Sequence, residues 1–434
     1  MRGSDACFIL STTFQKSGKL PDKPEMTPYR APLHRRLGNQ VLSLLLVTAL
    51  GVTPTLAIGA PGKAELEATT RSGWDHFYSS EYDEALSDFE KVWEARPDDA
   101  NALNHVLDAL IYRELYRYNA LDTRLYSKQG FINSKQVPID SSIKQRIKDL
   151  TDKSLLLSDK RLRADPRDVQ ALYSRGVTEG LRSSYQVIVE HAWFSALRNA
   201  LAARHDHEEV LKLRPDWTDA KTIVGAHNFV VGSLSAPMKA MAGIAGIRGD
   251  KSKGLEMLAE AGNAGGETSA DARIALALFL RREERFMDAV EVVRTLTRDH
   301  PRSFLFALEE ANLLNAAGKT PDAAVVLTRI LSGCKEGKYP NPHLELAYYA
   351  MGESQRGQGK LPEALQYFLK AAAATSSNTL DYRQRAMLAA GQISDLLLKR
   401  EDAITQYRAT IALDGATEEA ASARKYLARP YRAQ

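Results

Sequence analysis

The chain has few cysteines and little net charge. Of its 434 residues only Cys7 and Cys334 are cysteines, too few for the disulfide framework of a small secreted domain. We expect Cys334 to lie in a loop or to be half-buried. The formal net charge of +4 is small for this length. It argues against a dedicated nucleic-acid-binding protein, which usually carries a basic face, and we expect no nucleic-acid partner.

The chain also lacks the motifs of common enzyme classes. It contains no HExxH, GxSxG, P-loop or GxGxxG sequence. We therefore predict a noncatalytic protein with no catalytic residue, no cofactor and no metal site. An enzyme is a third hypothesis, since catalytic groups can be far apart in sequence. It requires perturbed titratable residues in a cleft, and His191, His205 and His207 are the first places to look.

The N-terminal apolar run is too short to cross a bilayer. Residues 41–52 form about twelve apolar positions, whereas a transmembrane helix needs roughly 20. This run follows a basic stretch that begins at Arg30 and precedes the small residues Thr55 and Ala57, as in a secretory signal. We assign 1–57 to an upstream extension and signal peptide, with translation from Met26 and cleavage after Ala57. The mature chain is then exported to the periplasm or beyond; an uncleaved N-terminal anchor is the alternative.

What the chain does have is a recurring pattern of small and aromatic residues. It occurs three times, as Gly73, Ala85 and Phe89, as Gly352, Ala364 and Phe368, and as Gly391, Ala403 and Tyr407. The small residues let two helices approach closely, and the aromatic residue fills the gap between neighbouring hairpins. Alanines 289 and 323 are one 34-residue period apart. The pattern resembles the tetratricopeptide repeat, a two-helix unit, in a protein of the secreted bacterial type.

The resemblance implies an all-α fold over residues 64–428. We predict a right-handed α-solenoid of antiparallel helix hairpins, with about eight units and irregular, extended middle repeats. No segment alternates apolar and polar residues as a strand does. Residues 64–262 form the irregular N-terminal region, and 269–428 form the regular C-terminal region, which ends in a polar capping helix near 417–428.

Three irregular segments interrupt the repeats between residues 112 and 249. The polar segment 127–142 follows the tyrosines at 112, 116, 118 and 126, which either pack this insertion or line a ligand or peptide groove. We expect one long helix over about 185–213, with Trp193 and Phe194 in the core. An apolar, glycine-rich link is expected over 232–249.

The long helix carries a run of metal-type side chains, from His205 to Glu209. Residues i and i+2 of a helix point about 200° apart, so His205 and His207 cannot share one ion without distortion. His205 and Glu209 lie on one face but make an incomplete site. We therefore interpret this run as a solvated helix face.

The repeat resemblance also implies a binding groove, formed by the first helices of successive repeats. The family's groove positions can be transferred to this chain by their place within the repeat. They fall on Tyr173, Tyr349, Glu353, Arg356, Arg385 and Gln392. We expect an exported scaffold that binds a protein or peptide in the cell envelope. The alternative is a periplasmic solute- or polymer-binding accessory protein, with a pocket in the middle region near 112–130 and 185–213. The sequence leaves the oligomeric state open.

Overall fold

A computed structural model describes residues 62–125, 137–244, 246–374 and 380–433. Residues from Gly59 to Gln434 form one compact unit. The predicted signal peptide, Tyr126 and most of the predicted polar segment lie outside the described residues. In the part of the chain that the structure describes, no helix is both long and apolar enough to cross a membrane.

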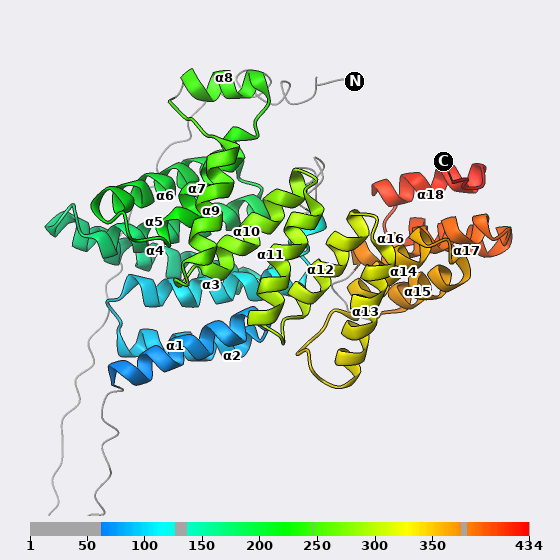
Figure 1. Cartoon of the computed structure of the whole chain (residues 1–434), viewed down its shortest axis with the longest axis horizontal. Coiled ribbons are helices and arrows are strands. Elements are labelled where there is room, and N and C mark those ends of the chain that lie inside the picture. Colours follow the sequence, from blue (N-terminus) through cyan, green and yellow to red (C-terminus); the bar gives the residue numbers. More distant parts are fainter. Residues whose placement is uncertain (1–61, 126–136, 245, 375–379, 434) are drawn as a thin grey trace, which may run out of the picture. The chain divides into compact units, whose positions relative to one another are not determined.

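The described residues form helices and no strands (Figure 1). The N-terminal elements are α1 Lys63–Tyr78, α2 Tyr82–Ala95, α3 Ala100–Arg117, the 3₁₀ turn η1 Thr123–Leu125 and α4 Ser141–Ala164. The middle elements are α5 Val169–Tyr185, the π-helical turn η3 Gln186–Glu190, α6 Trp193–Leu213, α7 Ala220–Gly232, α8 Ala236–Ile244 and α9 Lys251–Asn263. The C-terminal elements are α10 Ser269–Arg282, α11 Phe286–Asp299, α12 Phe304–Ala316, α13 Thr320–Lys335, α14 Leu344–Gly357, α15 Leu361–Ala373, α16 Leu380–Leu396, α17 Arg400–Leu413 and α18 Glu418–Ala428.

Consecutive helices pack against each other along the chain, apart from α8. Within the described ranges they form eight pairs: α1/α2, α3/α4, α5/α6, α7/α9, α10/α11, α12/α13, α14/α15 and α16/α17. The first helices of neighbouring pairs also contact one another, as in α12/α14 and α14/α16. The all-α prediction of about eight helix hairpins is confirmed. The predicted boundary between an irregular and a regular region stays a prediction.

The small and aromatic positions pack as the pattern indicates. Phe368 and Tyr407 are fully buried, and each ring lies against the glycine of the preceding helix. A Cβ atom added to Gly352 would come within 2.6 Å of the Phe368 ring, and one added to Gly391 within 2.5 Å of the Tyr407 ring. Only glycine allows this approach, because real Cβ atoms do not come so close to another atom.

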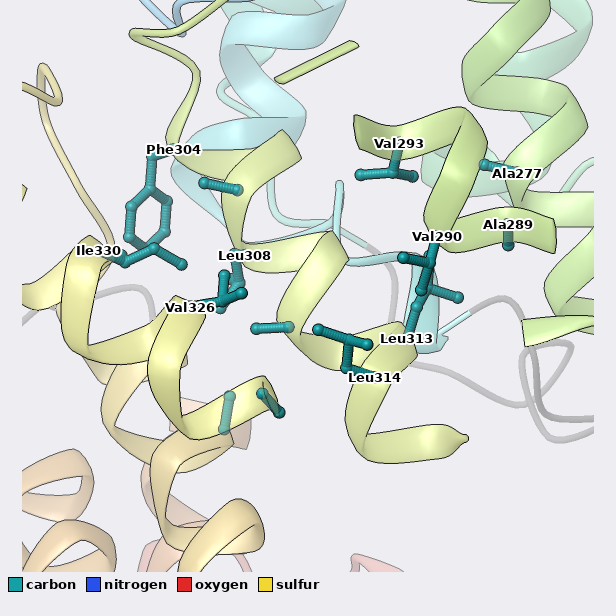
Figure 2. Packing of buried hydrophobic residues seen from close by; sticks show 14 of the residues in the cluster. Ala277, Ala289, Val290, Val293, Phe304, Leu308, Leu313, Leu314, Val326 and Ile330 are labelled. Carbon is teal, nitrogen blue, oxygen red and sulfur yellow. The ribbon is translucent and has the colours of Figure 1, made fainter. Parts of the chain in front are cut away.

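One hydrophobic cluster runs from Phe229 of α7 to Met351 of α14 and Tyr382 of α16, and the last hairpins have smaller clusters of their own. Figure 2 shows Phe304 and Leu308 of α12 facing Val326 and Ile330 of α13. The predicted capping helix is also present, since Thr417 accepts a hydrogen bond from the backbone N–H of Ala420 at 3.1 Å and α18 begins one residue later. A side chain at this position satisfies an N–H that a helix terminus otherwise leaves unpaired.

The prediction of one helix over 185–213 is wrong. Tyr185 ends α5, and η3 leads to His191, whose φ of 53° is left-handed. A non-glycine residue in this conformation cannot continue a right-handed helix, so α6 begins only at Trp193. Phe194 is 71% exposed and therefore not a core residue.

The glycine-rich link over 232–249 contains a helix that was not predicted from the sequence. Helix α8 begins with Ala236 and Pro237, and proline is well tolerated in the first turn of a helix. None of its residues is buried, and Ile244 is 90% exposed. Its apolar composition therefore reflects no contact with the core.

The first helix pairs lie against elements more than 180 residues further along the chain. Arg302 donates hydrogen bonds to Asp75 and Glu81 at 2.8 Å. The Tyr116 hydroxyl donates to the backbone carbonyl of Asn341 at 2.8 Å, and Asn119 donates to Glu345 at 3.2 Å. These contacts close α1–α3 onto α12 and the start of α14.

Candidate functional site

Five of the six predicted groove residues line one cavity. Tyr349, Glu353 and Arg356 come from α14, and Arg385 and Gln392 come from α16. The cavity has a volume of about 450 Å³ and also reaches α10, α12 and α18. Residues spaced three or four apart lie on the same face of a helix, so α14 presents all three of its side chains to this space. We call this cavity the arginine groove.

Four arginines give the arginine groove its name: Arg124, Arg281, Arg356 and Arg385. Arg281 is ion-paired with Glu309 at 2.7 Å. Arg385 is ion-paired with Glu419 of α18 at 3.2 Å, whereas Arg356 lies 3.9 Å from Glu353. The side chains of Arg356 and Arg385 are 32% and 26% exposed, so both can reach a ligand in the groove.

Two tyrosines form the aromatic part of the arginine groove. The rings of Tyr349 and Tyr382 meet edge to face, with centroids 5.7 Å apart. Arg124 donates a hydrogen bond to the Tyr382 hydroxyl at 2.6 Å and lies over both rings. Burial raises the pKa of Tyr349, so its phenol stays neutral and can donate a hydrogen bond at physiological pH.

The sixth predicted groove residue, Tyr173, lies elsewhere. It is 4% exposed and packs between His207 and Trp217, with both ring centroids 5.3 Å away. Its repeat belongs to the irregular middle of the chain. Positions transferred from regular repeats predict the direction of a side chain less accurately there. In this position Tyr173 contributes to the core between α5, α6 and α7.

Several residues of the arginine groove were missed by the sequence reading. Arg281 and Asn312 occupy first helices of earlier repeats, so the same phase argument could have found them. Glu419 belongs to the capping helix, which has no repeat phase. Arg124 lies between the two helices of the second pair, α3 and α4, more than 200 residues before Tyr349, and no local pattern indicates that it reaches the groove.

The run from His205 to Glu209 is not a uniformly solvated face. His207 and Asp206 are 1% and 2% exposed. The His207 ring is hydrogen-bonded to the Ala203 carbonyl at 2.8 Å, and burial lowers its pKa to about 4. Asp206 accepts two hydrogen bonds from Arg175, both at 2.8 Å. Among the described residues no three metal-type side chains are grouped to hold an ion.

The tyrosines before the insertion have separate roles. Tyr118 donates a hydrogen bond to the Pro138 carbonyl at 3.0 Å, which packs the returning chain. Tyr116 is buried and contacts the loop before α14 through Asn341. Tyr112 lines a second, apolar cavity.

Cys334 is half-buried near the C-terminal end of α13, as expected. Burial raises the pKa of its thiol to about 11. A thiol with so high a pKa is almost entirely protonated at neutral pH and is therefore a poor nucleophile.

Comparison with known protein families finds a match within the C-terminal half of the chain. A sequence profile of the tetratricopeptide repeat family matches residues 274–339, which include most of α10 and all of α11, α12 and α13. Residues 274–339 are therefore similar to that family of helical repeats. No curated protein matches the chain.

Solved structures give weak matches over long stretches. A tetratricopeptide repeat protein from Parabacteroides merdae ATCC 43184 is 13% identical, over 74% of this chain and 98% of that one, with a TM-score of 0.32. Yeast Tom70 is 12% identical, over 84% and 88%, with a TM-score of 0.38. The type IV pilus biogenesis factor PilW is 14% identical, over 64% and 92%, with a TM-score of 0.30.

Proposed function

We propose that the chain is a noncatalytic scaffold whose arginine groove binds an extended peptide segment of a partner protein. The observation that carries this proposal is the convergence of Tyr349, Glu353, Arg356, Arg385 and Gln392 on one cavity. Tetratricopeptide repeat proteins generally bind protein partners, and the groove is formed by the first helices of successive repeats. Its volume of about 450 Å³ is sufficient for a few side chains of such a segment.

The charges of the groove favour a segment that carries carboxylates. Arg124 and Arg281 are already paired, with Asp122 at 3.1 Å and with Glu309 at 2.7 Å. The preference for carboxylates therefore depends on Arg356 and Arg385, which lie beside Glu353 and Glu419. A guanidinium group donates through five N–H groups and binds a carboxylate in bidentate fashion. Arg385 holds Glu419 at 3.2 Å. Arg356 lies 3.9 Å from Glu353 and donates a hydrogen bond to the Tyr431 hydroxyl at 2.8 Å. A ligand carboxylate can therefore bind alongside these partners or replace them.

We predict that Arg356→Ala combined with Arg385→Ala weakens binding of acidic peptides at least tenfold. A hydrogen bond to a charged group contributes about 1.5–3 kcal/mol, and about 1.4 kcal/mol corresponds to a tenfold change in affinity. The measurement is fluorescence anisotropy with dodecapeptides rich in aspartate and glutamate, compared with peptides in which these are asparagine and glutamine. Circular dichroism checks that the variant is folded.

Arg298→Ala is the matched control. Arg298 is 73% exposed, pairs only loosely with Asp299 at 3.6 Å and does not line the groove. Its replacement should leave peptide affinity unchanged. If the double variant binds acidic peptides as tightly as the native protein, the arginine groove is not the peptide site. If no peptide binds the native protein, the peptide-scaffold proposal is wrong.

We also propose that the scaffold acts in the cell envelope after export, on the basis of the apolar run 41–52 and the small residues Thr55 and Ala57. Expression of the full chain in a bacterium should give a mature protein that begins at Ile58. N-terminal sequencing of the periplasmic and secreted fractions measures this. A chain that keeps its upstream residues in the membrane fraction supports the uncleaved anchor, and one that keeps them in the cytosol overturns export.

A further inference from the structure

A second cavity lies between the N-terminal helix pairs and α10–α12. It has a volume of about 300 Å³, and we call it the apolar cavity. Its wall combines residues distant in sequence, among them Phe77 of α1, Tyr112 of α3, Ile274 of α10 and Phe306 of α12. It exists because α1–α3 close onto α12, as the contacts of Arg302 and Tyr116 describe.

The size and lining of this cavity are unusual for a packing defect. Protein interiors contain few voids larger than a water molecule, whereas small-molecule sites start at about 300 Å³ and are mostly apolar with a few polar groups. Apolar and aromatic side chains make up most of this wall. Val293 and Leu308, which Figure 2 shows in the core between hairpins, also line it.

Two polar atoms of the wall are buried without a hydrogen-bond partner among the described residues, the Tyr78 hydroxyl and Asn312 Oδ1, and only the second belongs to α12. Asn312 of α12 is 4% exposed and lines the apolar cavity. Its Oδ1 is buried and accepts no hydrogen bond from any residue that the structure describes. A buried polar atom without a partner is destabilising, by an amount similar to a lost hydrogen bond. A ligand that supplies a hydrogen bond at this point would relieve that cost.

The polar groups beside Asn312 are already satisfied. Thr123 donates to Glu309 at 2.7 Å, and Arg281 donates to the other oxygen of the same carboxylate at 2.7 Å. The ion pair is internally neutral, so this end of the cavity has no unpaired charge that requires an ionic ligand. The chemistry favours a neutral polar head at Asn312.

We propose that the apolar cavity binds a single-chain neutral amphiphile, with its chain between α3, α10 and α12 and its hydroxyl or amide head at Asn312. At roughly 30 Å³ for each methylene-sized group, the volume that one water occupies in the liquid, the cavity holds a chain of about ten carbons. This site is independent of the peptide site in the arginine groove, although Asn312 lies between the two cavities and lines both.

The first test is titration of the purified full chain with 1-decanol. This probe has the inferred chain length, and its hydroxyl both donates and accepts. We expect one molecule to bind, observed by calorimetry and native mass spectrometry, with a higher Tm at saturation. Failure of 1-decanol to bind the native protein up to its solubility limit would falsify the proposal.

Two variants locate the binding site. Ile274→Trp adds volume within the wall and should weaken 1-decanol binding at least tenfold, and Ser184→Trp, at an exposed residue of the same wall, is the second choice if Ile274→Trp does not fold. Val325→Trp is the matched control, since Val325 is 62% exposed on α13 and does not line the cavity. Unchanged affinity in a folded Ile274→Trp or Ser184→Trp variant places 1-decanol elsewhere and overturns the site.

Asn312→Leu tests the polar head separately from the cavity. Leucine has a similar size and removes the unpaired acceptor, so the variant should fold with equal or higher Tm. Affinity for 1-decanol should fall roughly tenfold, the effect of one hydrogen bond. Unchanged affinity would show that Asn312 has only a structural role and would contradict the assigned orientation of the ligand.

Discussion

At the scale of single residues, the least predictable feature is which polar side chains are buried. His207 belongs to a run of charged residues but lies in the core, whereas the apolar Phe194 of the same helix is 71% exposed. Asp271 occupies the first turn of α10, where the helix dipole favours a charged carboxylate. Burial, together with Glu267 and Asp219 nearby, nevertheless raises its pKa to about 7.

We predict that Asp271→Asn stabilises the protein at high pH. Between pH 3.8 and about 7 the unfolded carboxyl is ionised while the folded one keeps its proton. Stability from this group is therefore fully present below pH 3.8, falls as the pH rises through this window, and is lost above about 7. Asparagine removes this pH dependence. Between pH 4 and pH 8 the variant should therefore gain up to about 4 kcal/mol of unfolding free energy relative to the native protein, about 1.4 kcal/mol for each of roughly three pKa units. Chemical denaturation at both pH values measures this gain.

Other titratable groups near Asp271 also contribute to the pH dependence of stability. Asp108 of α3 is half-buried, and its partial removal from water raises its pKa, which adds a dependence of the same sign. Tyr78 and Glu267 face the same space. The matched control is Asp322→Asn, since Asp322 is an exposed residue in the first turn of α13. If both variants change with pH in the same way, burial of Asp271 is not the cause.

At the scale of elements, the periodicity of the repeat predicts the regular hairpins. It fails where the backbone departs from the geometry of the repeat. The small and aromatic positions of α14–α17 pack as expected, because each hairpin buries its own pattern against its neighbours. The break between η3 and α6 depends on a left-handed His191, a conformation with no sequence signal at a histidine. Helix α8 was missed because its residues contact no core and so show no amphipathic period.

At the scale of the whole compact unit, the decisive feature is the closure of α1–α3 onto α12 and the start of α14. Ion pairs and apolar contacts both cross this junction. Arg302 reaches Asp75 and Glu81, while Phe306 packs near Tyr78 with ring centroids 6.3 Å apart. Partly exposed ion pairs contribute little, about 0–1 kcal/mol, and burial of an aromatic ring contributes more.

We predict that apolar packing, rather than the ion pairs, holds this junction. Phe306→Ala should cost about 2 kcal/mol, below the 3–5 kcal/mol of a fully buried phenylalanine because the ring is partly exposed. Arg302→Ala should cost less than about 1 kcal/mol. Urea denaturation measures both, with Val325→Ala as an exposed control. A larger loss from Arg302→Ala than from Phe306→Ala would mean that the charges hold the junction.

The amino-acid sequence by itself determined the hairpin fold and most of one candidate site. Glycine, alanine and aromatic residues at repeat spacing report contacts between neighbours, and such contacts are local in sequence. The same phase placed Tyr349, Arg356 and Arg385 on one face. Tyr173 did not follow, because its hairpin departs from the repeat.

Only the tertiary structure decided which distant elements meet. Arg124 enters the arginine groove, and Tyr112, Ile274 and Phe306 together enclose the apolar cavity. Each hairpin contributes a small rotation and displacement, and these accumulate along the chain. Whether α1–α3 meet α12 depends on the total rotation and displacement, to which the breaks at His191 and around α8 also contribute. No single window of the sequence contains it, so the distant residues that complete the two cavities could be found only in the folded chain.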